Sequence, residues 1–323
     1  MSFKTNNVKN GGTLSKQYGG IHAGGWVDLF PKSWIPYIQL CRLSPPAGLI
    51  LIFFPHLFGA LHAGATRNLP IDEVARVSAL LVGGSFFYNN AGHAWNDLVD
   101  ADIDSKIERT RKRPIPRGDV SKTAAFIFSA SQALGCLIFL FPMPIDAAMA
   151  ALATFLATTY YPYAKRHFPA PQLVLGFCLT WGVMVGSAGA GVPAPWTDPS
   201  TLYLFVGSAL WVIIYDTIYA HQDLVDDLKL GVKSTAVLFG RWSRAALWFL
   251  WAIMSASFVA SGVYGGLGFP YYAISVPGAV MSIGIMIASV DLKDPASCWA
   301  WFTQGTNTGA LIAGGLVGEY LLR

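Results

Sequence analysis

Nine stretches of about 20 mostly apolar residues run along the chain, separated by short breaks rich in polar residues, glycine or proline. A helix needs about 20 apolar residues to cross the hydrocarbon core of a bilayer. The stretches are apolar on every side rather than alternating, which favours helices over barrel strands. The sequence therefore predicts an all-α integral membrane protein with nine transmembrane helices, near residues 45–65, 73–95, 121–141, 144–162, 170–191, 200–222, 243–264, 270–290 and 300–321.

The composition agrees with a lipid environment. Hydrophobic residues make up 54% of the 323 residues and charged residues 12%, which excludes a soluble two-domain protein. The net charge is only +4, so nucleic acid is not expected as a partner. The four cysteines lie far apart and show neither zinc nor disulfide spacing. Small residues at Gly182, Gly186, Ser187 and Gly189 predict close helix packing.

The distribution of basic residues predicts the orientation in the membrane. With nine helices, the N-terminus and every second loop share one side, and all Lys and Arg residues except Arg67, Arg76 and Arg323 fall there. The positive-inside rule makes this side cytoplasmic, or matrix in mitochondria. Residues 1–40 lack the features of a signal or transit peptide. They are predicted to form a flexible cytoplasmic tail whose aromatic residues, from Trp26 to Tyr37, lie at the membrane surface.

Acidic residues are concentrated in two segments, 96–104 and 216–227, which hold eight of the eighteen Asp and Glu residues. Acids close to a membrane are costly and usually functional. If the preceding helices continue through these segments, residues four apart fall on one face. The oxygen-bearing faces then comprise Asn96, Asp100 and Asp104 in the first segment and Tyr219, Asp223 and Asp227 in the second. Asp97 and Asp216 lie close to these faces, whereas Asp102 points away.

Four predicted helices separate the two segments, so both emerge on the same side and their carboxylates can face each other. Facing carboxylates repel unless cations lie between them, and hard oxygen ligands select Mg²⁺, which keeps positions for phosphate oxygens. The predicted metal ligands are Asn96, Asp97, Asp100, Asp104, Asp223 and Asp227. Phosphate donors are expected among Lys106, Arg109, Arg111, Arg113, Lys165 and Arg166. The implied ligand is a diphosphate with a hydrophobic tail.

Simpler explanations exist for each segment by itself. One acidic cluster is compatible with a solvated loop that caps a helix, and the basic run 109–117 with topology determination or binding of anionic lipids. Two spaced clusters on one side of the membrane favour the metal and diphosphate interpretation over these alternatives.

Several motifs follow one another in a fixed order. They are Arg42-Leu43 with Pro46 and Gly48; Asn96-Asp97-x-x-Asp100-x-x-x-Asp104 with Arg109-Thr110 and Arg113-Pro114; Tyr161-Pro162-x-x-Lys165-Arg166 with Pro171-Gln172 and Leu175-Gly176; Asp216-x-x-Tyr219-Ala220-x-x-Asp223-x-x-Asp226-Asp227 with Gly231-x-Lys233-Ser234; and Cys298-Trp299 with Phe302. In these motifs the chain resembles the UbiA-type membrane prenyltransferases, in particular their 4-hydroxybenzoate polyprenyltransferase branch. The resemblance covers about residues 37–323.

The resemblance implies nine transmembrane helices around a central cavity, in which two Asp-rich motifs hold Mg²⁺ and a prenyl diphosphate and the prenyl chain passes to an aromatic ring. It assigns metal and diphosphate contacts to Asn96, Asp100, Asp104, Asp223 and Asp227, and phosphate oxygens to Lys165, Arg166 and Arg113. Arg42 would face the carboxylate of the acceptor. Many relatives carry a basic residue where this chain has Ala101, so a phosphate contact there is in doubt.

The expected reaction begins with ionisation of the allylic C–O bond, while Mg²⁺ and basic side chains stabilise the departing diphosphate. Aromatic rings and a dry wall protect the allylic cation, and Tyr160, Tyr161 and Tyr219 are the candidates for this role. An electron-rich phenol ring then attacks. The predicted catalytic residues are Asp100 and Asp223 at the metal, and Asp216, which would assist by deprotonating the phenol.

Two enzyme functions share this chemistry. A 4-hydroxybenzoate polyprenyltransferase of ubiquinone biosynthesis uses a long polyprenyl chain in mitochondria, whereas fungal meroterpenoid enzymes prenylate polyketide-derived aromatic acids, commonly with farnesyl diphosphate. The N-terminal composition favours the second, with a cytosol-facing site in the endoplasmic reticulum or another endomembrane. A membrane terpene cyclase and a cation transporter are further alternatives. No protein partner is predicted, and residues 41–323 are expected to form one prenyltransferase domain.

Overall fold

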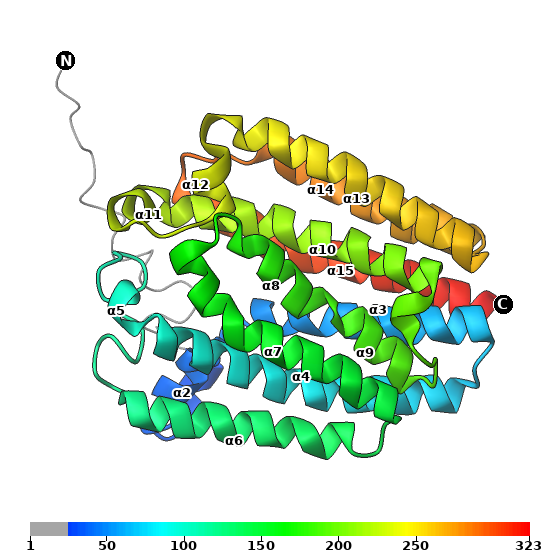
Figure 1. Cartoon of the computed structure of the whole chain (residues 1–323), viewed down its shortest axis with the longest axis horizontal. Coiled ribbons are helices and arrows are strands. Elements are labelled where there is room, and N and C mark those ends of the chain that lie inside the picture. Colours follow the sequence, from blue (N-terminus) through cyan, green and yellow to red (C-terminus); the bar gives the residue numbers. More distant parts are fainter. Residues whose placement is uncertain (1–24) are drawn as a thin grey trace.

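The structure, a computed structural model, describes residues 25–323, and this part of the chain consists of helices joined by turns. Nine long helical rods of the described chain lie alongside one another (Figure 1), one for each predicted stretch. They are α3 (Ala47–Arg67), α4 (Ile71–Val99), α6 (Lys122–Leu140), α7 (Ile145–His167), the pair α8 (Pro171–Thr180) and α9 (Gly182–Gly189), α10 (Pro199–Ala220), α13 (Ser243–Gly265), α14 (Val276–Ser289) and α15 (Pro295–Leu322). The all-α class is confirmed.

The rods differ in how apolar they are. Six segments of the described chain are long and apolar enough to cross a membrane by length and composition, and they contain α3, α6, α8 with α9, α10, α13 and α14. The rods α4, α7 and α15 fall outside this group. In α4 the reason is visible, because Asn89 and Asn90 are buried inside the bundle. Inward-facing polar residues lower the hydropathy of a helix without exposing it to lipid as a polar surface.

The centre of the bundle depends on glycine where α3 crosses α9. A Cβ atom on Gly59 would overlap the carbonyl oxygen of Val183, and one on Gly186 would overlap that of His56. The two backbones are therefore in direct contact, which only glycine permits. This contact confirms the close packing predicted at Gly186. Large buried side chains such as Trp211 fill the adjacent core.

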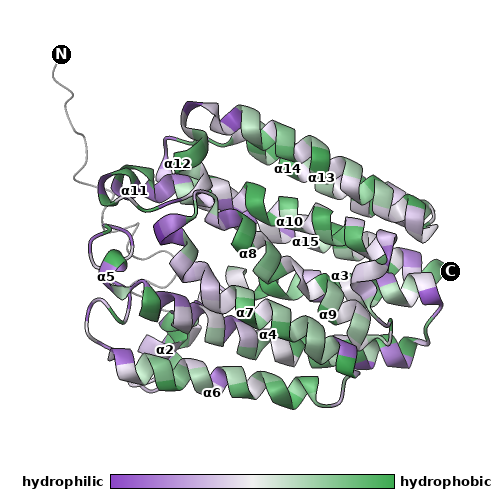
Figure 2. Ribbon diagram, in the orientation of Figure 1, coloured by the Kyte–Doolittle hydropathy of each residue, from purple (hydrophilic) through white to green (hydrophobic). Residues whose placement is uncertain are grey.

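Both acidic segments lie at the same end of the bundle, as predicted. After α4 the chain forms α5 (Ala101–Asp104) and a series of turns over residues 105–121. After α10 it forms η3 (His221–Asp223) and α11 (Leu224–Leu230). Figure 1 shows α5 and α11 together at one end, with α12 (Thr235–Phe239) nearby. Figure 2 shows hydrophilic residues gathered there, beyond the apolar middle of the rods.

The helices do not continue unbroken through the acidic segments, which corrects one prediction. α4 ends at Val99 with Asp100 as its C-cap, and α10 gives way to a 3₁₀ turn at His221. The helical hydrogen bonds nevertheless persist in the first segment: the Asp100 amide donates to Asn96 O at 2.9 Å and the Asp104 amide to Asp100 O at 2.8 Å. Asn96, Asp100 and Asp104 therefore keep a common face.

The structure describes only the last part of the predicted N-terminal tail. Residues 1–24 of the predicted tail lie outside the described residues. The following segment forms η1 (Trp26–Leu29) and α2 (Ile35–Leu40). The side chains of Trp26, Phe30 and Trp34 are exposed, and their rings follow one another at centroid distances of 5.8 and 6.0 Å. The position of this aromatic row at the membrane surface stays a prediction.

Candidate active site

A cavity of about 210 Å³ opens at the end of the bundle where the two acidic segments meet. Oxygen-bearing side chains of both segments line it: Asn96, Asp100, Asp104, Asp216, Asp223 and Asp227. The same wall contains the cationic side chains of Arg42, Arg109, Arg113, Lys165 and Lys233. Leu51 and Ile52 of α3 and Leu175 and Leu179 of α8 add an apolar patch to the wall. The two acidic segments thus face each other across one cavity, as the sequence predicted.

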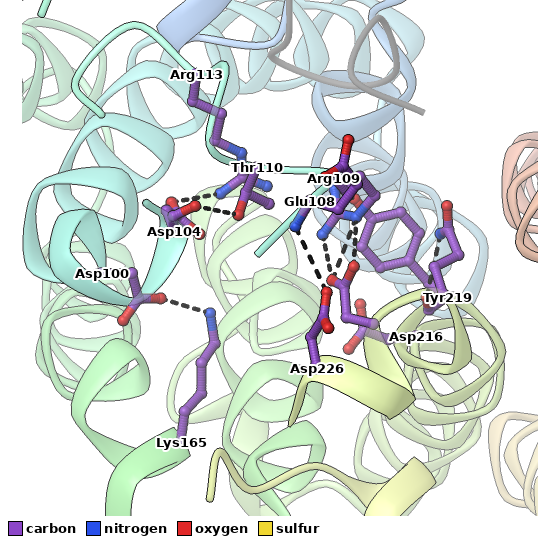
Figure 3. Close-up of polar contacts among 12 residues, drawn as sticks. Asp100, Asp104, Glu108, Arg109, Thr110, Arg113, Lys165, Asp216, Tyr219 and Asp226 are labelled. Carbon is purple, nitrogen blue, oxygen red and sulfur yellow. Dashed lines mark hydrogen bonds and ion pairs between the residues drawn. The ribbon is translucent and has the colours of Figure 1, made fainter. Parts of the chain in front are cut away.

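Cations from α7 and from the loop 105–121 hold the first acidic segment. Lys165 donates to Asp100 Oδ2 at 2.8 Å and to Asn96 Oδ1 at 3.1 Å. Arg113 Nη1 lies 2.8 Å from Asp104 Oδ2. Figure 3 shows the Lys165–Asp100 and Arg113–Asp104 contacts side by side. Asp100 and Asp104 are therefore each paired with a cationic side chain.

The second acidic segment is held by an arginine that belongs to the loop after the first. Arg109 donates from Nε to Asp223 Oδ1 at 2.9 Å and from Nη2 to Asp223 Oδ2 at 2.6 Å. It also donates to the Tyr219 hydroxyl at 2.8 Å, and its guanidinium carbon lies 5.0 Å from the centroid of the Tyr219 ring (Figure 3). A bidentate pair of this kind fixes both partners. Arg109 therefore ties the two acidic segments together.

The ion pairs keep these buried arginines charged. Burial lowers the pKa of Arg109, but Asp223 raises it, and the net pKa lies above the ordinary arginine value. Burial acts in the same way on Arg113, whose pKa is likewise raised overall by Asp104 and Asp97. Burial also raises the pKa of the Asp104 carboxyl, an effect that Arg113 opposes. Two permanently charged guanidinium groups thus face the cavity.

Asp97 is placed differently from the other acids of its segment. Its side chain is fully buried, and Oδ1 lies 2.5 Å from Arg42 Nη2 and 3.0 Å from Arg113 Nη1. Asp97 does not line the cavity. The prediction that it is a metal ligand therefore finds no support in its position, because its Oδ1 faces two guanidinium groups and the residue lies outside the cavity wall.

Four further predicted residues lie outside the cavity wall. Lys106 and Arg111 are exposed, and Arg111 pairs with Glu108. Arg166 donates to the backbone carbonyls of Val99 and Pro162 at 2.8 and 2.9 Å, as a cation at the end of a helix commonly does. Tyr160 is exposed and bonds to His167. Phosphate contacts of Lys106 and Arg166, and a ring contact of Tyr160 with the substrate, would need these side chains to move.

Asp102 lies where the sequence placed it, away from the metal face. Its carboxylate pairs with Lys122 at 2.9 Å on the exposed surface, and this hydrogen bond lowers the pKa of Asp102.

The residue chemistry of the cavity suits Mg²⁺. Asn96, Asp100, Asp104, Asp223 and Asp227 offer oxygen atoms only, the ligands that hard divalent cations prefer. Asp100 Oδ1 is buried and accepts no hydrogen bond from the described residues, and Arg166 Nη1 lies 3.5 Å from it as an ion-pair partner.

The cationic side chains determine how these oxygens are spaced. Among residues 25–323, no three His, Cys, Asp or Glu side chains are grouped closely enough to hold an ion by themselves. Lys165, Arg113 and Arg109 separate the carboxylates into ion pairs. The oxygen ligands are of the type that magnesium prefers. These ion pairs would have to open before several carboxylates could bind one magnesium ion.

Gln172 is a site residue to which the sequence analysis gave no role. Its amide nitrogen donates to Asp216 Oδ2 at 3.2 Å, while its amide oxygen accepts from the Thr235 amide at 2.8 Å. The second bond fixes which end of the amide faces Asp216. Gln172 stands in the Pro171-Gln172 motif, but only the packing of α8 against α10 reveals its partner.

Tyr161 and Tyr219 line the cavity, as expected of rings that face a cationic substrate. Lys165 Nζ lies 4.8 Å from the centroid of the Tyr161 ring. Tyr219 packs against Phe302, with 4.5 Å between ring centroids, and Phe302 lines the same cavity. Phe302 of α15 thus adds its ring to those of Tyr161 and Tyr219 at the cavity wall.

Comparison with known proteins agrees with this geometry. The sequence pattern of the "UbiA prenyltransferase family" matches residues 43–311. The "4-hydroxybenzoate polyprenyltransferase, mitochondrial" of Schizosaccharomyces pombe is 36% identical over 303 residues, which are 92% of this chain and 83% of the relative. "Prenyltransferase stbC" of Stachybotrys bisbyi is 35% identical over 309 residues, covering 93% of this chain and 91% of the relative.

Solved structures show the same fold. A UbiA homologue from Aeropyrum pernix, in its apo form, superposes with a TM-score of 0.70 at 25% identity, covering 83% of this chain and 97% of that one. A UbiA homologue from Archaeoglobus fulgidus bound to DMAPP and Mg²⁺ superposes with a TM-score of 0.68 at 17% identity, covering 88% and 99%. The chain is an integral membrane protein and a prenyltransferase that belongs to the UbiA prenyltransferase family.

Proposed function

We propose that this enzyme transfers a prenyl group, with farnesyl favoured, from a prenyl diphosphate to a polyketide-derived aromatic acid, and that it requires Mg²⁺. One observation carries the proposal: a single cavity joins two facing sets of carboxylates, three buried cations and an apolar wall. Oxygen ligands and cations suit a metal-bound diphosphate, and the apolar wall suits a prenyl chain. The relative "Prenyltransferase stbC" of Stachybotrys bisbyi, matched over 91% of its length, supports prenyl transfer.

The cavity residues assist release of the diphosphate in two ways: some would bind magnesium and others would contact the phosphate oxygens. Asn96, Asp100 and Asp104 on one side and Asp223 and Asp227 on the other would hold magnesium. When bound, magnesium lowers the energy of the leaving diphosphate by acting as a Lewis acid. The donors for the remaining phosphate oxygens are Lys165, Arg109 and Arg113, each of which exchanges a carboxylate for a phosphate oxygen.

The aromatic side chains stabilise the allylic cation of the prenyl chain. Ionisation breaks the allylic C–O bond and leaves a positive charge on the prenyl chain, next to the rings of Tyr161, Tyr219 and Phe302. The apolar wall excludes water, which would otherwise capture the cation. The ring of the deprotonated acceptor then forms the new C–C bond, and transfer of its ring proton to the phenol oxygen restores aromaticity.

Asp216 is the proposed proton acceptor for the phenol of the aromatic substrate. It lines the cavity, and Gln172 orients its carboxylate. Among the described residues, its carboxylate accepts a hydrogen bond only from Gln172, whereas Asp100, Asp104 and Asp223 are bonded to Lys165, Arg113 and Arg109. An Asp216→Asn variant keeps the hydrogen bond to an amide partner possible but removes the base. Full activity of that variant would exclude the role.

The experiment that tests the function is a product assay. Membranes that contain the enzyme are incubated with geranyl, farnesyl, geranylgeranyl or a long polyprenyl diphosphate, and with 4-hydroxybenzoate or 2,4-dihydroxy-6-methylbenzoate, in Mg²⁺ or EDTA. Products are identified by mass. We expect a farnesylated dihydroxy acid in Mg²⁺ and none in EDTA.

The same assay separates the alternatives. A product made only from 4-hydroxybenzoate and the long chain, together with growth rescue of a ubiquinone-deficient yeast, would assign the enzyme to ubiquinone biosynthesis, the activity in the name of the S. pombe relative. A hydrocarbon or alcohol formed from the diphosphate without an acceptor would assign it as a terpene cyclase. Either result would refute the proposal. The proposed location is an endomembrane, with the cavity facing the cytosol.

A further inference from the structure

Asp97 is the most deeply buried acid of the first segment, and its carboxylate is directed at arginines. Three donors reach its Oδ1: Arg42 Nη2 at 2.5 Å, Arg113 Nη1 at 3.0 Å and Asn96 Nδ2 at 3.4 Å. Its Oδ2 is buried and accepts no hydrogen bond from the described residues. Asp97 itself is absent from the cavity wall, whereas Arg42 and Arg113 are part of it.

The two arginines come from separate parts of the fold. Arg42 lies between α2 and α3, and Arg113 lies in the loop 105–121. Arg113 Nη1 also contacts Asp104 Oδ2 at 2.8 Å, so the same guanidinium group joins Asp97 to a carboxylate of the cavity wall. Asp97 therefore connects Arg42, which lies near the apolar residues of α3, with Arg113, which is one of the predicted diphosphate donors.

The backbone of Arg42 supports this interpretation. Its φ angle is 54°, in the left-handed region that residues other than glycine seldom adopt. Such a conformation persists where surrounding contacts hold it, and it often occurs at functional sites. The buried contact with Asp97 is one that holds the Arg42 side chain at the cavity wall.

We propose that Asp97 is a positioning residue and no metal ligand: its buried carboxylate fixes Arg42 toward the aromatic acceptor and Arg113 toward the diphosphate. This inference rests on the proposed function for the names of the two substrates. It separates Asp97 from Asp100 and Asp104, although all three belong to one motif. The consequence is that removal of Asp97 disturbs substrate placement and leaves metal affinity intact.

Metal binding provides the first test. Mn²⁺ replaces Mg²⁺ as the probe, and its binding to the purified full-length protein is followed by electron paramagnetic resonance in the presence of an unreactive farnesyl thiodiphosphate. We expect Asp97→Asn to bind Mn²⁺ within about threefold of the wild type and Asp100→Asn to bind it at least about tenfold more weakly. Equal weakening by the two substitutions would overturn the proposal.

A double-mutant cycle provides the second test. Asp97→Asn should lower kcat/KM for the aromatic acid by about 100-fold, since small displacements of binding groups have effects of this size. If Asp97 acts through Arg42, Asp97→Asn combined with Arg42→Gln is no worse than the stronger single variant. Combined with Arg109→Gln, a residue whose guanidinium group donates to Asp223 and Tyr219, the effects should multiply. Effects that multiply with Arg42→Gln as well would contradict the proposal.

Two provisions keep these results interpretable. If Asp97→Asn does not fold, Asp97→Glu retains the charge and takes its place, with the same expectation of normal Mn²⁺ binding and reduced turnover. If the wild type forms no prenyl product from any substrate pair, the proposed function fails, and Mn²⁺ binding still decides whether Asp97 is a metal ligand.

Discussion

The two acidic segments have similar sequences but different surroundings. In the first, Asp97, Asp100 and Asp104 are all buried and paired with cations from α7, the loop 105–121 and the turn between α2 and α3. In the second, Asp227 is buried, but the Asp223 side chain is 14% exposed and the Asp226 side chain 30% exposed.

Their partners differ as well. The first segment has four ion pairs with buried or half-buried cations, whereas Asp223 depends on Arg109, which comes from the other half of the site. The comparison teaches that one pattern of carboxylates serves two purposes. The first segment is part of the folded core, whereas the second contacts the loop 105–121 through Arg109 and the Glu108 amide.

The largest effect should come from the carboxylates that both segments present to the cavity. Asp100→Ala and Asp223→Ala should each lower turnover roughly 1,000-fold, about 4 kcal/mol of transition-state stabilisation, because each removes a ligand of the proposed metal–diphosphate complex. Product formation per minute, measured by mass at saturating substrates, checks this. Wild-type turnover in either variant would remove that segment from the metal site.

The next largest effect should be a difference between the two segments in the free energy of unfolding. Asp97→Asn leaves two buried arginines short of a counter-charge and should reduce the free energy of unfolding by about 3–5 kcal/mol. The matched control is Asp226→Asn in the second segment, where the partner Lys229 is exposed and a loss below about 1 kcal/mol is expected. Thermal unfolding in detergent, followed by tryptophan fluorescence, measures both. Equal shifts would mean that burial does not distinguish the two segments.

The link between the segments can be tested through Arg109. Arg109→Gln removes the bidentate contact to Asp223 and a phosphate donor, so the KM for the prenyl diphosphate should rise about 10- to 100-fold. The KM for the aromatic acid should stay within about threefold, because Arg42 and not Arg109 is assigned to the acceptor. Arg109→Lys, which keeps the charge but not the fork, should lie between the two. An unchanged KM for the diphosphate would contradict the assignment.

The smallest effect is expected from the surface pair of the first segment. Asp102→Asn and Lys122→Met should change neither turnover nor the melting temperature measurably, because Asp102 and Lys122 are both exposed. These variants also control for the introduction of any substitution into the acidic segment. A loss of turnover in Asp102→Asn would place this residue at the site, against the structure.

Much of the fold follows from local sequence. A transmembrane helix is recognised within a window of about 20 residues, so each predicted stretch corresponds to a long rod. The common face of Asn96, Asp100 and Asp104 also follows from local sequence. Residues four apart stay on one face even where the helix is interrupted. The common location of both acidic segments followed from counting the helices between them.

The partners of the charged residues did not follow from sequence. Lys106, Arg109 and Arg113 stand close together in one basic run, yet only Arg109 and Arg113 reach the cavity. Asp97 and Asp100 are three residues apart, yet one faces two buried arginines and the other the cavity. Gln172 acquires its role only because α8 packs against α10.

The sequence by itself determined the membrane helices, the two oxygen-rich segments at one end and the family to which the chain belongs. Only the tertiary structure decided which carboxylates face the cavity and which cation each one meets. Hydropathy and helical spacing are properties of neighbouring residues, whereas an ion pair such as Arg109–Asp223 joins residues 114 positions apart. Its partners are chosen by the packing of whole helices, which no local pattern of residues specifies.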